Sequence, residues 1–487
     1  MSGDTPGSSV PRRRRALSNI GGQAEQAGDR ELAGLLADAF EGADDPDASR
    51  EHVHGFHSYP ARLHPDLARP LIGALSPAGG VVLDPFCGSG TVLVESRLQG
   101  RRAIGVDLNP LAVRLARLRS RGRTAPERDA LLARAREVAE GADERRQRKA
   151  GTSRRYGRDD VALFAPHVLL ELDGLRVGIE ATTNPTLRSD LELVLSSILT
   201  KVSLRTGDSA NHIGPKRVAP GFPARHFVAR TDELTRQLAE YETLLPDGAP
   251  LPDVIEADAR SLPPVGPVDL VLSSPPYPGN YDYLHHHEAR LRWLNLDASG
   301  IDRGEVGARR HLEASGALDA RARWLGELTA VLTSIRSRLA PSGRVVLVLA
   351  DSVVARQPFY NDDLLAEAAP RAGLTVVARA SQARPHFHTP SAHAFDRRPR
   401  REHVICLAAL PGAPPPRPDR GPAHDRGPAR GHDRERQALP REALPRQALP
   451  HPAAPRQALP RPADSRPADP RADRSPRSPT RPGRRDR

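Results

Sequence analysis

Short apolar runs rich in β-branched residues alternate with segments of helical length, and this alternation constrains the fold more than any other feature. The runs span residues 81–83, 103–106, 254–256, 268–272, 344–349, 375–380 and 403–408. Segments of helical character follow several of them, at 90–98, 110–119, 324–339 and 362–372. Strands joined through helices form parallel sheets that are covered on both faces. We therefore predict an α/β fold with a Rossmann-like, mostly parallel, seven-stranded sheet.

One interval breaks the alternation. Residues 121–230 separate the second and third runs, which is too long for an ordinary crossover. We predict an inserted subdomain there, with a charged helix at 128–149, an apolar helix at 190–203 and a basic loop at 216–226. The catalytic domain would then comprise residues 51–120 and 231–410. Residues 1–50 would be a partly disordered N-terminal extension, and 411–487 a disordered tail rich in Pro and Arg.

The formal charge of +12 lies almost entirely in the tails. Residues 411–487 carry 18 Arg against 9 Asp and Glu, and residues 1–19 carry 4 Arg against 1 Asp, which leaves residues 20–410 at net zero. A tail with a proline in each repeated pentad, such as RQALP at 436–440, builds no core. If the folded part binds nucleic acid, it must gather its arginines locally on one face.

Two cysteines, Cys87 and Cys406, are too few for a disulfide framework or a zinc site. A reducing, cytoplasmic location is therefore expected. The first 20 residues lack an apolar signal core, and no apolar run approaches the length needed to cross a bilayer, so no membrane association is expected.

A glycine-rich turn follows the first predicted strand in the segment VVLDPFCGSGT, residues 81–91. Gly88 and Gly90 would let the backbone turn tightly and approach a ligand at the carboxyl end of that strand, where open α/β sheets bind nucleotides. Asp107 ends the second strand, 23 residues after Asp84, in the position that accepts ribose hydroxyl groups. No Gly-Lys-Ser/Thr follows the glycines, which excludes a P-loop.

A second motif, Ser-Ser-Pro-Pro-Tyr at 273–277, follows the run at 268–272. Pro275 and Pro276 make the backbone rigid and leave it without N–H donors, so the Pro275 carbonyl is free to accept a hydrogen bond. An aromatic amino group is a poor nucleophile because its lone pair is delocalised. Accepting its hydrogens at the Ser274 hydroxyl and the Pro275 carbonyl would favour a pyramidal nitrogen with an available lone pair. Tyr277 would stack on a flipped base.

Neither cysteine fits the nucleophile that would be needed to methylate a cytosine ring carbon. Methylation at a cytosine ring carbon needs a Pro-Cys nucleophile, but Cys87 follows Phe86 and Cys406 follows Ile405. Activation of an amino group by the segment 273–277 would need no covalent intermediate.

The motifs together resemble a known family. DPFCGSGT and GVDLNP resemble motifs I and II of class I S-adenosylmethionine-dependent methyltransferases, in the branch that modifies base amino groups, and Ser-Pro-Pro-Tyr resembles its motif IV. EADAR (256–260) resembles motif III, and HSYPAR (57–62) resembles the segment preceding motif I. The resemblance implies a class I methyltransferase fold with S-adenosylmethionine as cofactor. The implied cofactor-binding residues are Tyr59, Pro60, Asp84, Pro85, Phe86, Gly88, Gly90, Thr91, Asp107 and Asp258, and the implied catalytic residues are Ser274, Pro275, Pro276 and Tyr277.

Within this set the resemblance implies separate roles. Asp84 would face the methionine amino group, Asp107 would hold the ribose, and Asp258 would meet the adenine amino group. The segment with Tyr59 and Pro60 would close over the methionine end.

The resemblance also implies a substrate. The Ser form of motif IV is more often associated with N4 of cytosine, and the Asp or Asn form with N6 of adenine. We therefore expect a DNA methyltransferase of the restriction-modification type that acts on a base flipped out of duplex DNA, with cytosine N4 favoured. Adenine N6 in DNA, or a guanine or adenine amino group in RNA, are the alternatives among enzymes. A nucleic-acid-binding protein that keeps the fold without catalysis is the alternative from another class.

The Ser-Pro-Pro-Tyr motif at 274–277 is named here the clamp. The segment after it combines Tyr281, Tyr283, three histidines at 285–287 and arginines at 290 and 292. Adjacent histidines point in different directions on a helix and have no carboxylate at ligand spacing, so we expect no metal. The aromatic residues would serve either as substrate contacts or as core residues of a covering helix, and the sequence favours neither. Residues 121–230 are a hypothetical target-recognition region because of their length and basic loop.

Overall fold

The computed structural model describes residues 22–43, 45–205, 214, 216–280, 282–314, 316–384 and 393–412. Its centre is an eight-stranded sheet with the order β1-β9-β10-β6-β5-β2-β3-β4. The strands are β1 (Glu25–Gly28), β2 (Val81–Asp84), β3 (Arg102–Asp107), β4 (Asp253–Glu256), β5 (Val268–Ser273), β6 (Leu339–Ala350), β9 (Leu374–Ala383) and β10 (Arg401–Ala409). Neighbours from β4 to β6 pair in parallel, whereas β10 is antiparallel to both β6 and β9. Every predicted strand is present, which confirms the mostly parallel α/β fold.

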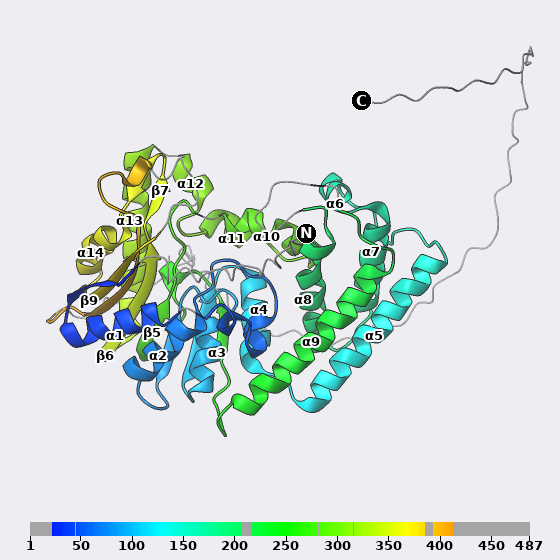
Figure 1. The fold of residues 1–487 in the computed structure, drawn as a ribbon, viewed down its shortest axis with the longest axis horizontal. Helices are drawn as coiled ribbons and strands as arrows, with labels where there is room; N and C mark the ends of the chain where they lie inside the picture. The colour runs from blue at the N-terminus through cyan, green and yellow to red at the C-terminus, as the bar shows by residue number, and fades with distance from the viewer. Residues whose placement is uncertain are drawn as a thin grey trace, which may run out of the picture. The chain divides into compact units, whose positions relative to one another are not determined.

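Helices cover both faces of this sheet (Figure 1). Helices α1 (Arg30–Glu41), α2 (Pro65–Leu75) and α3 (Thr91–Leu98) lie on one face, and α13 (Ala317–Arg336) and α14 (Asn361–Arg371) lie on the other. Strand β5 shows the alternation that produces two cores, because successive side chains point to opposite faces. Leu270 and Leu272 pack with the α1–α3 layer, and Val271 packs with Trp324 and Leu365 of the opposite layer.

Two local differences from the sequence prediction appear in these layers. Residues 25–41, for which no element was predicted, form β1 and α1, and β1 pairs with β9 through Glu25 opposite Ser381. Helix α13 ends at Arg336 rather than 339, because β6 already begins at Leu339. Residues 1–21 of the predicted extension, and 413–487 of the predicted tail, lie outside the described residues.

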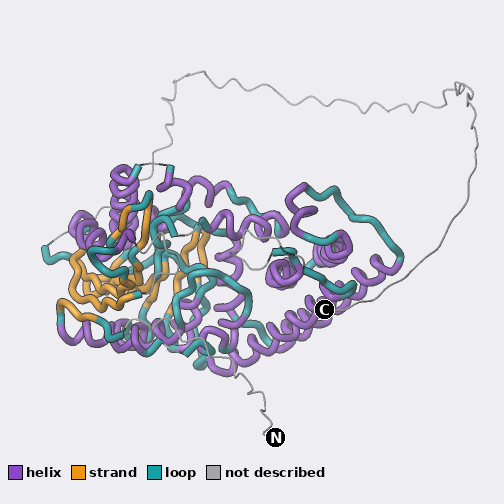
Figure 2. The backbone as a smooth tube through the Cα atoms, turned by 45° about the horizontal axis from the view of Figure 1, so that its top comes forward, coloured by secondary structure: helices purple, strands orange, loops and turns teal. Residues whose placement is uncertain are grey.

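Helices fill the long interval between β3 and β4. After α4 (Pro110–Arg121) come α5 (Ala125–Gln147), α6 (Arg158–Leu163), α7 (Pro166–Glu180), α8 (Pro185–Val202) and α9 (Phe222–Leu244). Helices α5, α7, α8 and α9 lie side by side (Figures 1 and 2). Helices α5 and α8 match the predicted charged and apolar helices. Helix α9 begins inside the predicted basic loop, at Phe222, and continues past residue 230 to Leu244.

The helices of this interval share a hydrophobic cluster with segments outside it. Leu191, Val194 and Leu238 pack in one cluster with Val53 and Phe56, which precede β2. Leu291 and Trp293 of α10 (Tyr283–Trp293) belong to the same cluster. The inserted helices are therefore built into the fold around the carboxyl edge of the sheet.

The remaining elements are short. They are η2 (Ala48–Arg50), η3 (His52–Gly55), η4 (Ala259–Ser261), α11 (Ser299–Gly304), α12 (Arg309–Glu313), the hairpin β7 (Ser352–Val354) and β8 (Gln357–Phe359), and η5 (His393–Phe395). Among the described residues, no helix combines the length and apolarity needed to cross a membrane.

Candidate active site

A pocket lies at the carboxyl ends of β2, β3, β4 and β5. Its space is about 660 Å³, with open solvent at the mouth included. The lining residues are Tyr59, Ala61, Pro85, Phe86, Gly88, Asp107, Leu108, Asn109, Ala257, Asp258, Ala259, Ser274, Pro276, Tyr283, Ile301, Gly304, Glu305 and Val306. The structure therefore brings residues from all the predicted motifs to one cavity.

The glycine turn between β2 and α3 uses its two glycines differently. Gly88 has φ +49° and lines the pocket, and a Cβ there would lie 3.3 Å from Cε1 of Tyr59. Gly90 has φ +87°, and a Cβ there would lie 3.0 Å from the Ala116 Cα. A side chain at either position would be strained and crowded. Gly88 thus opens the backbone to a ligand, while Gly90 lets α3 approach α4. Thr91 is buried at the start of α3 and does not line the pocket.

Asp107 joins the ends of β2 and β3. Its carboxylate accepts hydrogen bonds from the backbone N–H groups of Gly88 and Asn109, each at 2.8 Å. Burial raises the pKa of Asp107 to about 6, although these two donors act in the opposite direction. The carboxylate is thereby held in place at the pocket wall.

Asp84 is buried behind the wall and does not line the pocket. Its carboxylate accepts hydrogen bonds from the Ser273 hydroxyl at 2.6 Å and from the Phe86 N–H at 3.1 Å. Burial raises the pKa of Asp84 to about 7. In this structure Asp84 ties the end of β2 to the end of β5 and shapes the Pro85–Phe86 segment, which does line the pocket.

The segment before α2 contributes Tyr59 and Ala61, whereas Pro60 does not line the pocket. The Tyr59 ring stacks on His287 of α10 with 4.8 Å between ring centroids. His57 lies at φ +66° and Ala61 at φ +51°, which are uncommon conformations for residues with a Cβ. The His57 Nε2 atom hydrogen-bonds the Ser196 hydroxyl of α8 at 2.9 Å. An inserted helix therefore supports this strained segment.

Asp258 lines the pocket beside β4 and forms an ion pair with Arg260. The Arg260 guanidinium contacts its carboxylate at 2.6 Å and also donates to the Gly304 carbonyl at 3.0 Å. This arginine thereby joins the end of β4 to α11.

Sequence reasoning missed the wall around α11. Ile301 and Val306 are buried apolar residues that line the pocket, as does Leu108 at the end of β3. Glu305 accepts hydrogen bonds from the Tyr283 N–H at 2.8 Å and from Arg310 at 2.6 Å, and burial raises its pKa. Nothing in the spacing of this polar segment indicated a role, since only the fold brings it over β3 and β4.

The predicted clamp is divided between the pocket and its surroundings. Ser274 and Pro276 line the pocket, whereas Pro275 is buried and neither it nor Tyr277 lines the pocket. The Tyr277 hydroxyl donates to Glu402 of β10 at 2.9 Å and lies 3.4 Å from the Ser274 hydroxyl. Burial, assisted by the Glu402 charge, raises the pKa of Tyr277, so this hydroxyl remains a donor. Glu402 was not predicted, because it lies 125 residues further along the chain.

In the segment after the clamp, Tyr281 lies outside the described residues, and Tyr283 lines the pocket. His287 is buried against Tyr59, whereas His285 is exposed and His286 half-buried. The three histidines of α10 therefore diverge.

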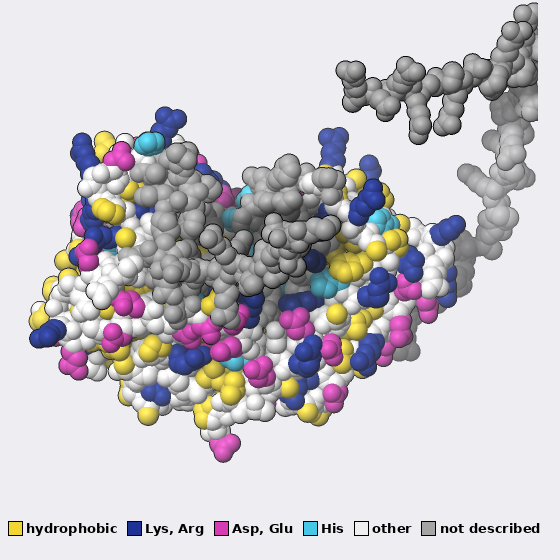
Figure 3. Space-filling view, in the orientation of Figure 1, with side chains coloured by type: hydrophobic (Ala, Val, Ile, Leu, Met, Phe, Trp, Pro, Cys, Tyr) yellow, Lys and Arg dark blue, Asp and Glu magenta, His cyan; other side chains and the backbone are white. Residues whose placement is uncertain are grey.

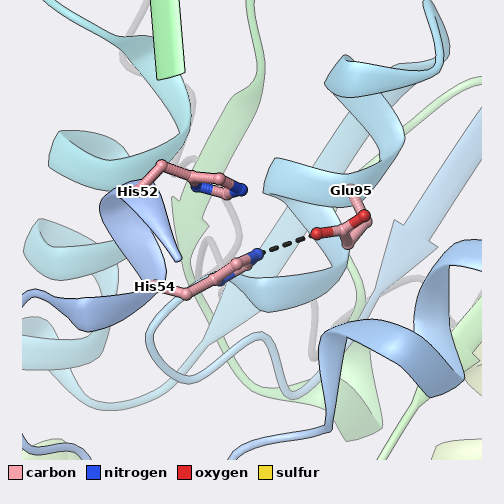
Figure 4. A group of neighbouring side chains, drawn as sticks. All are labelled: His52, His54 and Glu95. Atoms are coloured by element: carbon pink, nitrogen blue, oxygen red, sulfur yellow. Dashed lines mark hydrogen bonds and ion pairs between the residues drawn. The ribbon is translucent and has the colours of Figure 1, made fainter. Parts of the chain in front are cut away.

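Two buried clusters contain residue types that bind metals. In the first, His54 Nε2 lies 2.8 Å from Glu95, with His52 alongside (Figure 4). Arg119 lies 3.0 Å from His54 Nδ1, and an arginine can only donate, so Nδ1 accepts and Nε2 carries the hydrogen. Arg69 donates to the other Glu95 oxygen at 2.9 Å. The His54 and Glu95 atoms are thus used in hydrogen bonds between η3, α2, α3 and α4.

The second cluster consists of Asp351, Asp362 and His403, and these side chains also form hydrogen bonds and ion pairs. His403 Nε2 lies 3.2 Å from Asp351, which also accepts from the backbone N–H of Asn361, and Arg379 pairs with Asp362 at 2.5 Å. Among the described residues, hydrogen bonds and ion pairs thus engage most side chains of these two groups, whereas His52 Nδ1 is buried without a hydrogen-bond partner.

The sheet is mostly parallel, with β10 antiparallel between β6 and β9. Together with the glycine turn after β2 and the carboxylate at the end of β3, this arrangement defines a class I methyltransferase fold. Proteins of this class use S-adenosylmethionine. The pocket fits that cofactor, because it combines the open backbone at Gly88, the carboxylates of Asp107 and Asp258, and an apolar wall that includes Leu108 and Ile301.

Comparisons with known proteins agree with this class. Residues 37–118 match the model of a family described as DNA methylase, of the N6/N4 type. The chain is 37% identical over 90 residues to the type II methyltransferase M.MvaI of Kocuria varians, covering 18% of this chain and 19% of the relative. It is 35% identical over 69 residues to M.MjaII of Methanocaldococcus jannaschii, covering 14% and 13%. A tRNA (guanine(10)-N2)-dimethyltransferase of Methanothermobacter thermautotrophicus is 40% identical over 62 residues, covering 12% and 18%.

These matches span less than a fifth of each curated relative. Residues 37–118, which include the glycine turn and Asp107, are similar to the amino-methyltransferase family of the N4/N6 type. Among solved structures, the rRNA methyltransferase aviRa of Streptomyces viridochromogenes aligns with a TM-score of 0.29 at 14% identity, over 74% of this chain and 90% of that chain. This score is too low to carry an argument, and the fold assignment rests on the sheet order and the site.

Proposed function

We propose that the chain transfers the methyl group of S-adenosylmethionine to an exocyclic amino group of a base in duplex DNA, with N4 of cytosine as the favoured target. The observation that carries this proposal is the meeting of two motifs in one pocket: Ser274 and Pro276 of the clamp line the same cavity as Gly88 and Asp107. The type II methyltransferase relatives support DNA as the substrate. The serine in the clamp favours cytosine.

The proposed cofactor site follows the pocket wall. Asp107 would accept the ribose hydroxyl hydrogens, and Asp258 would meet the adenine amino group between Leu108 and Ile301. Tyr59, Pro85, Phe86 and Gly88 would contact the remainder of the cofactor. Bound there, S-adenosylmethionine supplies an electrophilic methyl group.

Four predicted cofactor residues take indirect roles in this proposal. Asp84, Gly90 and Thr91 do not line the pocket, so they would shape the turn rather than touch the cofactor. Pro60 would likewise act through the backbone of its segment, beside Tyr59.

The clamp would activate the amino group by accepting its hydrogens. The Ser274 hydroxyl and the Pro275 carbonyl would take one hydrogen bond each, which concentrates the nitrogen lone pair on the side of the methyl donor. The Ser274 hydroxyl can direct its own hydrogen towards Tyr277, at 3.4 Å, and so keep its lone pairs for the base. Tyr277, held by Glu402, would contact the flipped base.

One observation favours a second candidate function. The tRNA (guanine(10)-N2)-dimethyltransferase matches this chain at an identity similar to that of the DNA enzymes. Methylation of a guanine amino group in RNA would use the same pocket and the same clamp. Adenine N6 in DNA is the third target of this chemistry.

Product analysis separates these targets. The full chain would be incubated with isotopically labelled S-adenosylmethionine and either duplex DNA or tRNA, the nucleic acid digested to nucleosides, and the labelled nucleoside identified by mass. We expect N4-methylcytosine from DNA, and no product from a Ser274→Ala variant that still binds the cofactor. Labelled adenosine from DNA would change the target base, and labelled guanosine from tRNA alone would overturn the DNA proposal.

We further propose that the inserted helices take part in target recognition. Helix α8 supports the segment that contains Tyr59 through the bond between Ser196 and His57, and it also contacts Arg290 of α10. The insertion therefore touches two of the segments that border the pocket.

A further inference from the structure

The turn between α5 and α6 carries the densest positive charge of the inserted helices. Residues 145–158, named here the basic turn, contain seven Lys and Arg and no Asp or Glu. Arg145, Arg146 and Arg148 pair with acidic residues of α5 and α7. Within the part of the chain that the structure describes, Lys149 and Arg155 are exposed and form no ion pair. Figure 3 shows Lys and Arg side chains over the inserted helices, with acidic side chains between them.

Helix stability explains only part of this charge, because Arg145 and Arg146 lie in the last turn of α5, where the helix dipole favours cations. Arg158 is exposed in the first turn of α6, where the helix dipole disfavours a cation. Close like charges also repel one another. A negatively charged partner therefore explains the exposed cations Lys149, Arg155 and Arg158 better than the fold of the turn does.

The basic turn is attached to a helix that reaches the pocket. The Tyr156 ring stacks on Trp293 of α10 with 5.4 Å between centroids and 20° between ring planes. Directly after the turn, Asp160 accepts hydrogen bonds from Trp293 Nε1 at 3.1 Å and from Arg292 at 3.0 Å. Tyr156 also donates to Asp173 of α7 at 2.7 Å. These contacts hold the turn at the C-terminal end of α10.

The length of α10 sets the distance from the turn to the pocket. Tyr283, at the start of α10, lines the pocket, and Trp293 ends the helix. At 1.5 Å per residue the two are separated by roughly 15 Å along the axis. A duplex of that length carries about nine phosphate charges. The basic turn is therefore within reach of the phosphates that flank a base placed in the pocket.

We propose that the basic turn binds the phosphodiester backbone of duplex DNA beside the base in the pocket. This inference rests on the proposed function, since it takes duplex DNA as the substrate. Lys149, Arg155 and Arg158 neutralise phosphates and release their counterions, so this contact strengthens binding without reading sequence. The described core has almost no net charge of its own, and the basic turn gives it a local positive surface next to the pocket.

Salt dependence tests the proposal. Binding of the full chain to a fluorescent duplex DNA would be measured by anisotropy between about 50 and 200 mM KCl. The test variant is Lys149→Gln/Arg155→Gln/Arg158→Gln. The control is Arg30→Gln/Arg121→Gln/Arg136→Gln, which removes the same charge from exposed arginines of α1, α4 and α5. Both variants keep the Arg-rich tail, so its contribution is the same in each.

We expect the slope of log K against log salt to fall by about 2.7 in the test variant, at about 0.9 per lost phosphate contact. The ratio of the DNA affinities of the unaltered chain and the test variant should therefore change roughly 40-fold between about 50 and 200 mM KCl. The slope of the control variant should differ from that of the unaltered chain by less than about one. Equal slopes in the test and control variants would overturn the proposal, as would failure of the unaltered chain to bind duplex DNA.

Two further measurements separate this inference from the proposed function. Cofactor affinity by calorimetry should be the same in all three proteins, because the substituted residues lie outside the pocket. If the unaltered chain binds DNA with the expected slope but transfers no methyl group, the proposed activity fails while the basic turn stands. If transfer occurs and the slopes are equal, the basic turn fails alone.

Discussion

Tyr277 shows how the structure changes the interpretation of a motif residue. Its position after two prolines suggests only an aromatic face, but its hydroxyl donates to Glu402, and Glu402 accepts a second bond from Arg384 at 2.8 Å. The clamp is thus supported from β10, next to the end of β6. Glu402 does not line the pocket and would act through Tyr277, as a positioning residue.

We predict that Glu402→Gln lowers turnover with little change in cofactor affinity. A hydrogen bond to a charged group contributes about 1.5–3 kcal/mol, so kcat should fall roughly 10- to 100-fold, and Tyr277→Phe should have a similar effect. Single-turnover kinetics and calorimetry with S-adenosylmethionine measure the two quantities. The control is Glu25→Gln, which removes an exposed carboxylate of β1 that pairs with Arg401 of β10. Parallel losses of turnover and cofactor affinity would contradict this role.

Asp107 predicts a pH dependence of cofactor binding. Its pKa of about 6 is raised by burial, and the ionised form is the one that accepts hydroxyl hydrogens at both oxygens. Affinity for S-adenosylmethionine should therefore be nearly constant above about pH 7 and fall by up to about tenfold per pH unit below 6. Calorimetry between pH 5 and 8 measures the profile.

The contribution of Asp107 to the free energy of unfolding of the cofactor-free protein should change in the opposite direction to the affinity, because it increases as the pH falls. A carboxyl group whose folded pKa is raised favours the folded state when protonated, and this contribution is lost as pH rises from about 4 through 6. In Asp107→Asn the affinity should be weak and the profile should lose its step near 6. An unchanged step there would assign the titration to another group, such as Asp84.

At the scale of elements, α8 supports the segment before α2. His57 and Ala61 hold uncommon backbone conformations that persist only where neighbours impose them. The Ser196 hydroxyl provides one such contact, 139 residues from His57. An element of the insertion thus helps to place Tyr59 at the pocket.

We predict that Ser196→Ala destabilises the protein and weakens cofactor binding. Leaving buried His57 Nε2 without its partner costs about 1–3 kcal/mol. Thermal unfolding and calorimetry would be compared with Ser197→Ala, which removes a half-buried hydroxyl that donates to the Val194 carbonyl of its own helix. If both variants weaken cofactor binding equally, the contact with His57 is not responsible.

The elements also show what the sequence could predict. The strands and the turn at Gly88 follow from local patterns, since apolar runs and glycines act within a few residues. The α11 wall and Glu402 could not be predicted, because they depend on pairing between distant segments. Glu402 is placed by the antiparallel register of β10 with β6, where it lies opposite Ala350. The lining role of Ile301 depends on the packing of α11 against Leu108.

For the whole molecule, the shared core shows that the insertion is not a removable module. Phe56 and Tyr59, which lie beside or in the pocket, belong to the same hydrophobic cluster as Leu172 and Val194 of the inserted helices. Deleting residues 121–230 would expose this cluster and disturb the cofactor site together with any recognition surface. Substitution of exposed residues is therefore the suitable test of recognition.

The distribution of charge leads to a prediction for the tail. Residues 413–487 carry 18 Arg against 9 Asp and Glu, so truncation after Gly412 removes +9 of the formal +12. The last strand within the described residues, β10, ends before this point, at Ala409. The truncated protein should keep its thermal stability and cofactor affinity, and its methylated nucleoside should be unchanged. Its affinity for DNA should be lower at low salt, with a smaller salt dependence, because fewer counterions are released.

The truncated protein also separates the tail from the basic turn. If the turn binds phosphates independently, Lys149→Gln/Arg155→Gln/Arg158→Gln should lower the salt slope by the same amount, about 2.7, with or without the tail. Contributions from distant, independent sites add in this way. Anisotropy titrations of four proteins, with and without the tail and with and without the three substitutions, measure both contributions. A slope difference that disappears on truncation would show that the turn and the tail act on the DNA together.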